Sequence, residues 1–378
     1  MPETDYTIRH YLEGDEDQII ELLELVFGEF PKMRLNCSKK EHWKWKFKDM
    51  PPGLNPTLVV LTDEGKIIGA SHGQIKWTKI GGSVLLARKG AEVAVHPDYR
   101  RMGIYGRLVT KREKVSMGMG AVLSYSLISN PVIVRYKRDK KSDRYEPEFP
   151  QPLKQLMKVK DVHKFLDYQE RRGKIPKGRL ITSTGIKLLK AASSLRRASG
   201  SKIKPRTDYE LREISAFDDR IEGLWEEVKN EYDFIVVKSK EYLNWRYCDP
   251  RGGAYRVLLA QEGDSILGFL ALRVNEKDPD HPVGYIMEVL APRERDDVAD
   301  SLICWADEQI AEENVNAVYF TVASGHPYER LIKSHGYIDS RRSPQLFYRP
   351  YKRFKGLEGF EKAAPVRLHH QFGEYDSI

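Results

Sequence analysis

The sequence contains two similar halves about 200 residues apart, and this internal repeat restricts the folds open to the chain. The first landmark, Trp-Lys-Phe-Lys-Asp from Trp45, returns as Trp-Arg-Tyr-Cys-Asp from Trp245. Two further landmarks return in the same order, Glu64 to Gly69 as Glu262 to Gly268 and Glu92 to Pro97 as Glu288 to Pro292. Ordered landmarks at offsets of 195 to 200 positions are not expected by chance, so the sequence predicts a duplicated domain.

Each half has the same predicted order of elements: strand, amphipathic helix, aromatic segment, three strands, helix, strand. In the first half we expect them at 6–9, 15–26, 43–47, 57–62, 66–77, 83–95, 104–117 and 121–128. In the second half the matching strands and helices are expected at 210–214, 219–231, 254–261, 265–274, 284–290, 297–314 and 317–323. This order predicts an α/β (α+β) fold in which each half is a mixed, mostly antiparallel twisted sheet flanked by helices.

A strongly basic segment separates the halves. Residues 154–206 contain sixteen Lys and Arg against three acids, so the net charge of +8 originates there and the remainder of the chain is mildly acidic. We expect an N-terminal domain at 1–160, a basic helical linker at 161–206, a C-terminal domain at 207–349 and a tail at 350–378. An amphipathic helix over 178–197 would either bind an anionic membrane or nucleic acid, or pack as a connector between the halves. Its scarcity of aromatic residues disfavours nucleic acid.

Several classes of protein are excluded by composition. There is no run of 18 uncharged apolar residues, and the first residues lack the basic and apolar blocks of a signal peptide. Three widely separated cysteines do not form a disulfide framework or a local metal knuckle: Cys37, Cys248 and Cys304. We therefore expect a soluble cytoplasmic protein without a metal site.

Residues suited to binding an anion concentrate between Glu92 and Leu108, which read as strand, tight loop and helix. Pro97 ends the strand because it cannot donate to a β-ladder. The first turn of the following helix leaves its N–H groups free for an anion. Gly103 lets a phosphate approach the backbone closely, and the adjacent pair Arg100 and Arg101 supplies charge for a diphosphate.

At these residues the sequence resembles the GNAT family of acyl-CoA-dependent N-acyltransferases. The family loop, Arg/Gln-x-x-Gly-x-Gly/Ala, is matched by Arg100 and Gly103, while Tyr105 stands where a small residue is usual and Gly106 is displaced by one. The resemblance covers residues 5–150 and, more weakly, 208–348, which implies a tandem GNAT arrangement.

The second copy has lost the features of this loop. There is no glycine between Pro292 and Asp300, and four carboxylates, Glu294, Asp296, Asp297 and Asp300, lie where phosphates would bind. Because acids at a helix start repel a diphosphate, we expect the second copy to be degenerate.

The resemblance also implies roles for individual residues. The fourth and fifth strands of the first half should splay apart and hold the pantetheine arm of the coenzyme between them. Tyr136 would be the general acid that protonates the leaving thiolate, with packing beneath the sheet as the alternative. Glu92, or else a water, would be the general base, and His96 reads instead as a surface turn residue. The expected coenzyme-binding residues are Val93, Val95, Arg100, Arg101, Met102, Gly103, Ile104, Tyr105, Gly106 and Asn130.

The predicted activity is transfer of an acyl group from acetyl-CoA, or another acyl-CoA, to a primary amine by direct attack on the thioester. A small amine, an amino sugar and a protein amine are all open as acceptors. The alternative is a non-catalytic duplicated scaffold that binds an anionic partner, a membrane surface or nucleic acid, through the basic linker. Aminoacyl-tRNA-dependent transfer is disfavoured, because duplicated proteins of that kind do not keep such a loop. The tail should add one strand near 366–372 and cover the cleft.

Overall fold

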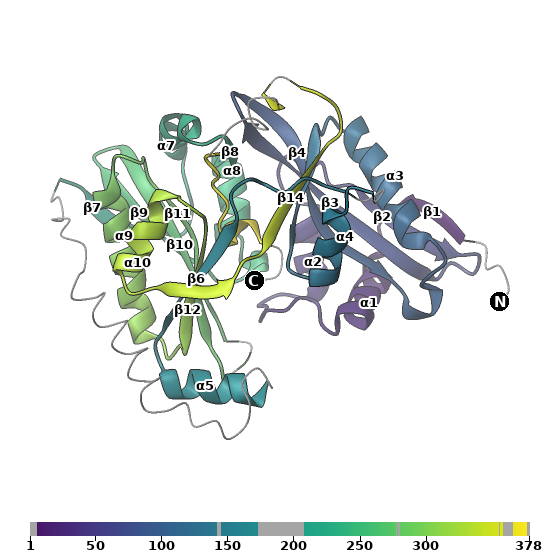
Figure 1. The fold of residues 1–378 in the computed structure, drawn as a ribbon, viewed down its shortest axis with the longest axis horizontal. Helices are drawn as coiled ribbons and strands as arrows, with labels where there is room; N and C mark the ends of the chain where they lie inside the picture. Colours follow the sequence, from purple (N-terminus) through teal and green to yellow (C-terminus); the bar gives the residue numbers. More distant parts are fainter. Residues whose placement is uncertain are drawn as a thin grey trace.

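The computed structural model describes residues 6–141, 145–172, 208–276, 278, 280–354, 356–357 and 366–375. Two seven-stranded sheets form two lobes side by side, the first in purple and blue and the second largely in green (Figure 1). The first half comprises β1 (Tyr6–His10), α1 (Glu16–Phe27), α2 (Lys39–Phe47), β2 (Thr57–Thr62), β3 (Ile67–Ile80), β4 (Ser83–Val95), α3 (Ile104–Gly118), β5 (Leu123–Ile128), α4 (Pro131–Arg138) and β6 (Leu153–Val159). After α5 (Val162–Arg171), the second half comprises β7 (Glu210–Ile214), α7 (Ile221–Val228), β8 (Phe234–Val236), α8 (Lys240–Leu243), β9 (Arg256–Glu262), β10 (Ser265–Asn275), β11 (Val283–Leu290), α9 (Asp296–Glu312), β12 (Ala317–Ala323), α10 (Pro327–Ser334), β13 (Ile338–Arg342) and β14 (Gln345–Pro350).

Helices cover both faces of the first sheet, as the alternation of apolar residues along β2 requires. Val59 packs with α1 and α2 in one apolar cluster, whereas Leu58 and Val60 pack with α3 in another. The second sheet repeats this arrangement, since Leu259 on β9 packs with α7 while its neighbour Leu258 packs with α9 and α10. The predicted fold class is confirmed.

The halves exchange their last strands. β14 pairs with β5 in the first sheet, and β6 pairs with β12 in the second, both antiparallel. Both exchanged strands lie near the junction of the two lobes (Figure 1). The expected boundary at residue 160 assigns β6 to the first domain, whereas its hydrogen bonds place it in the second sheet. Helix α5 also packs on the second half, where Phe165 joins a core cluster with Phe217 and Tyr319. The helix predicted at 178–197 lies outside the described residues.

Strands β4 and β5 are parallel neighbours that pair only between the middle of β4, at 87–89, and the start of β5, at 123–125. β4 continues to Val95 and β5 to Ile128 without further pairing between them. The expected splaying of the fourth and fifth strands is therefore confirmed. β11 and β12 repeat it, pairing only at 283–285 and 317–319.

The described part of the tail, 366–375, is folded into the protein. It makes a single parallel bridge, from Leu368 to Phe234 of β8, and a 3-10 turn at Phe372–Glu374, in place of the expected strand. Gln371 inserts between the splayed strands of the second half, where its side-chain amide exchanges hydrogen bonds of 2.8 and 3.1 Å with the backbone of Val289. Glu374 contacts Lys76 of the first half and Lys238 of the second, both at 3.2 Å. The tail thus joins the two lobes.

Candidate active site

A cavity of about 860 Å³ lies where β4 and β5 separate. One side of its wall comes from β4 and β5, including residues 90–93 and 124–128, and another from α3 and α4. The loop between α1 and α2 closes a third side through Phe30 and its neighbours. The cavity therefore connects the face covered by α3 with the face covered by α1 and α2.

The predicted coenzyme loop forms the approach to this cavity. Gly103 is the N-cap of α3 with φ of +75°, and Arg101 has φ of +68°, so the chain turns through two left-handed residues before the helix. Arg107 N–H donates to the Gly103 carbonyl at 3.1 Å, which closes the first turn of α3. The N–H groups that precede Arg107 in this turn have no partner within the helix and point out of its start. Nothing lies within 4 Å of the position that a Cβ on Gly103 would take. The space over this helix start is open to a ligand.

The unusual Tyr105 does not fill the loop. Its side chain is 53% exposed and lines the cavity together with Gly106 and Val93. Buried Ile104, by contrast, anchors the loop in the core cluster of α3. Asn130 caps α4 by accepting hydrogen bonds from Val132 N–H at 2.9 Å and Ile133 N–H at 3.4 Å.

The remaining predicted coenzyme residues lie around this approach. Val95 pairs with Gly69 at the end of β4, and its carbonyl accepts a hydrogen bond from Arg100 Nε at 3.4 Å. Met102 packs beside the same core cluster as Ile104.

The two predicted catalytic residues line the same cavity. Tyr136 lies on α4 with 59% of its surface exposed, so it does not pack beneath the sheet. Glu92 lies on β4 and forms an ion pair through Oε1 with Lys46 of α2, while its Oε2 is buried without a hydrogen-bond partner. A carboxylate oxygen buried beside a cavity is suited to accept a proton or a hydrogen bond from a ligand there.

A β-bulge brings Glu92 into this position. Ser71 of β3 pairs with Val93 and Gly73 pairs with Gly90, so His72 alone faces two residues of β4. Trp43 Nε1–H donates to His72 Nε2 at 3.2 Å, and His72 Nδ1 lies 2.9 Å from the Glu92 carbonyl. Burial lowers the pKa of His72 to about 3, so the ring is neutral and donates through Nδ1. The ring therefore holds the bulge in place.

Sequence reasoning missed Lys46 and His72. Lys46 lies within the repeated Trp-Lys-Phe-Lys-Asp landmark, which is the one signal that could have singled it out.

The equivalent positions of the second half are filled by protein. Glu288, the counterpart of Glu92, forms a 2.6 Å ion pair with Lys238 and a 3.0 Å contact with His369. The backbone N–H of Val289, the counterpart of Val93, donates a hydrogen bond to the Gln371 side chain. At the start of α9, Asp297 pairs with Arg295 at 3.0 Å. The side chains of the tail thus occupy the groove between β11 and β12.

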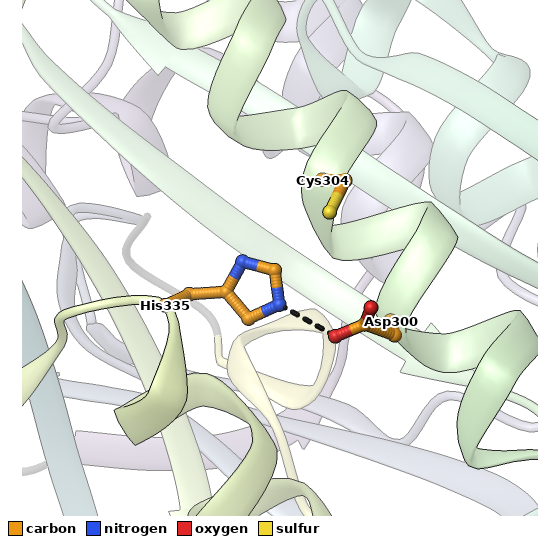
Figure 2. A group of neighbouring side chains, drawn as sticks. All are labelled: Asp300, Cys304 and His335. Atoms are coloured by element: carbon orange, nitrogen blue, oxygen red, sulfur yellow. Dashed lines mark hydrogen bonds and ion pairs between the residues drawn. The ribbon is translucent and has the colours of Figure 1, made fainter. Parts of the chain in front are cut away.

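Asp300 and Cys304 on α9 and His335 after α10 bring ligand atoms within 4.8 Å of one another (Figure 2). His335 Nε2 lies 2.9 Å from Asp300 and its Nδ1 lies 3.4 Å from Asp307. Burial opposes the imidazolium charge, but the two carboxylates outweigh it and raise the pKa of His335 to about 9. Burial and the same acids raise the pKa of Cys304 to about 11. The His335 ring and the carboxylates of Asp300 and Asp307 form an ion-pair network that ties the end of α10 to α9.

The sequence profile described as "Acetyltransferase (GNAT) domain" matches residues 7–136, which contain the loop, both predicted catalytic residues and most of the cavity lining. The two sheets repeat one arrangement of elements, and the fold extends over both. Residues 7–136 match this family, and the chain as a whole has the fold of a solved tandem GNAT protein.

Solved structures share this fold across nearly the whole chain. A tandem GNAT protein from the clavulanic acid biosynthesis pathway aligns at 14% identity and a TM-score of 0.54, covering 93% of this chain and 100% of that one. An N-myristoyltransferase from Saccharomyces cerevisiae with bound myristoyl-CoA aligns at 12% identity and a TM-score of 0.60, covering 93% and 80%. A probable N-acyltransferase from Enterococcus faecalis V583 aligns at 11% identity and a TM-score of 0.58, covering 92% and 72%. No curated protein matches the sequence of this chain significantly.

Within the residues described, no helix is both long and apolar enough to cross a bilayer.

Proposed function

We propose that the protein is an acyl-CoA-dependent N-acyltransferase with one working site, in its first half. The observation that carries this proposal is the cavity between β4 and β5, which opens at a glycine-capped helix start in the first half, whereas protein fills the equivalent groove in the second. The solved S. cerevisiae N-myristoyltransferase with the same fold holds myristoyl-CoA, which supports an acyl-CoA as co-substrate.

In this proposal the start of α3 holds the diphosphate through backbone N–H groups, with Arg100 and Arg101 supplying positive charge. The pantetheine arm follows the unpaired edge of β4 near Val93. The bound co-substrate supplies an activated carbonyl, the thioester, at the split between the strands. Acetyl-CoA is the first co-substrate to test.

The acceptor amine enters from the side of the α1–α2 loop. There Glu92 accepts the proton that the ammonium must lose before it can attack, and Lys46 fixes the carboxylate in place. On the other face, the Tyr136 hydroxyl donates a proton to the thiolate as it leaves. Both groups line the same cavity, as proton transfer during one attack requires.

The proposal is tested by following CoA thiol release from acetyl-CoA and longer acyl-CoAs in the presence of small amines, amino sugars and amine-bearing peptides. Product mass confirms that the amine gains the acyl group. We expect thiol release that depends on the amine and that Glu92→Gln lowers on the order of 10²-fold or more. Absence of acyl-CoA binding, or thiol release equal with and without every amine, would contradict it.

A further inference from the structure

Two buried arginines line the cavity at its inner end. Arg88 lies on β4 within the short stretch still paired with β5, and Arg112 lies on α3; they are 3% and 5% exposed. Arg112 donates to Ser71 Oγ at 2.8 Å and to the His72 carbonyl at 3.2 Å. A Cβ on Gly73, which shares a face of β3 with Ser71, would lie 3.1 Å from Arg88 Cδ, so both arginine side chains lie on the α3 face of the sheet.

Neither arginine has an acidic partner. Arg88 Nε donates to the neutral hydroxyl of Tyr351 at 2.8 Å, while Nη1 of Arg88 and Nε of Arg112 are buried without any partner. Among the described residues, no carboxylate lies within ion-pair distance of either guanidinium. The cavity's other cations differ: Lys46 pairs with Glu92, Lys137 with Glu146 and Arg349 with Glu113, and Lys32 is exposed to solvent.

Two uncompensated guanidinium groups beside each other are costly to bury. Burial and the charge of Arg88 together lower the pKa of Arg112 to about 9. An anion placed between them would offset this cost, and a carboxylate matches the planar fork of an arginine. The protein thus has a positive site prepared inside its cavity.

The position of the pair indicates which substrate carries the anion. A Cβ added to Gly90 would lie 4.0 Å from Arg88 Nη1 and 3.3 Å from Ser126 Cβ, so this nitrogen lies at the closed end of the split. A pantetheine arm that runs from the α3 start past Val93 points its acyl group toward this end. The acceptor side, at Glu92 and Lys46, lies on the opposite face.

We propose that the cavity selects an acyl group with a terminal carboxylate, a short dicarboxylic acyl-CoA, and that Arg88 and Arg112 bind that carboxylate. This inference rests on the proposed function, since it assigns the acyl end of the same site. Ser71, Gly73 and Gly90 are the small residues that leave space for the two side chains on this face of the sheet.

The test compares dissociation constants of succinyl-CoA and butyryl-CoA, which match in chain length and differ in the terminal charge. We expect the intact protein to bind succinyl-CoA at least tenfold more tightly, and Arg88→Met and Arg112→Met to abolish this preference. Arg88→Lys, which keeps a charge, should retain part of it. Arg349→Met is the matched control, because it removes a cavity arginine that already has Glu113 as partner, and it should change the ratio less than threefold.

The outcomes separate the two proposals. Acyl-CoA binding with equal affinity for both thioesters, or a preference that survives Arg88→Met, overturns this inference and leaves the proposed function standing. If the arginine variants instead raise the KM of a carboxylate-bearing amine and not that of a matched neutral amine, the carboxylate belongs to the acceptor and the assignment to the acyl group is wrong. Failure to bind any acyl-CoA contradicts the proposed function itself and this inference with it.

Discussion

Trp45 and Trp245 stack on each other with ring centroids 4.9 Å apart and planes 19° apart. Each indole N–H also donates to the backbone carbonyl of the other residue, at 2.8 Å from Trp45 and 2.9 Å from Trp245. The two residues are the first landmark of the sequence repeat, separated by 200 positions. Equivalent residues that make reciprocal contacts are the sign of a two-fold relationship, here within one chain. The duplicated halves therefore meet through the same surface.

We predict that Trp45 and Trp245 stabilise the junction jointly. Trp245→Phe removes one N–H donor and leaves the Trp45 carbonyl buried without its partner, which should lower the free energy of unfolding by about 1–3 kcal/mol. Urea denaturation of Trp45→Phe, Trp245→Phe and the double variant measures the coupling, expected at about 0.5–1.5 kcal/mol. Strictly additive losses would show that the stack contributes nothing beyond the two separate side chains.

Gly103→Glu should abolish acyl-CoA binding. The residue has φ of +75°, which a side chain adopts only with strain, and the added carboxylate would repel a diphosphate at the helix start. We expect the dissociation constant to rise at least a hundredfold in calorimetry. Gly263→Glu is the matched control, because Gly263 also has positive φ and open space around it but lies in a turn of the second half. Equal loss of binding in the two variants would assign the effect to backbone strain alone.

Tyr136→Phe tests the general acid. Because the side chain is largely exposed and its hydroxyl has no structural partner to lose among the described residues, stability should be unchanged. The turnover number kcat should fall on the order of 10²-fold with coenzyme affinity retained. Tyr145→Phe, another exposed tyrosine outside the cavity lining, should be silent. A normal kcat for Tyr136→Phe would remove this residue from the mechanism.

His335 should make stability depend on pH. Its pKa is raised to about 9, so folding favours the protonated ring. The contribution of His335 to the free energy of unfolding is complete below about pH 6.5, the pKa of an unperturbed histidine. It is lost as the pH rises through about 9, the pKa of His335 in the folded protein. The Tm difference between the intact protein and His335→Gln should shrink over this range. His163→Gln, on the exposed side of α5, should show no such trend. A Tm difference that stays constant from pH 6 to 10 would exclude the ion-pair network.

The two sheets and the tight turn before α3 could be predicted because their signals are local. Alternating apolar residues set the strands, and Pro97 and Gly103 mark the ends of the loop. The exchange of β6 and β14 could not be predicted, because β5 and β12 present the same kind of free edge to an incoming strand. The alternation of apolar and polar residues along a strand does not identify the strand with which it pairs. β8, at only three residues, is too short to leave a periodic signal.

The cavity was predictable only in part. Glu92 and Tyr136 were found through the family resemblance, but Lys46, Arg88 and Arg112 come from three separate elements. These three side chains line one cavity because β4 has a bulge and because β4 and β5 separate beyond their short paired stretch. Neither feature follows from the spacing of residues along the chain.

The number of acyl-CoA molecules bound per chain distinguishes one working site from two. Isothermal titration of the full-length protein with acetyl-CoA and with a non-hydrolysable acyl-CoA analogue should give a stoichiometry of one, because Gln371 fills the groove of the second half. The same titration of Gly103→Glu should show no binding. A stoichiometry of two, or binding retained in Gly103→Glu, would contradict a single site at the start of α3.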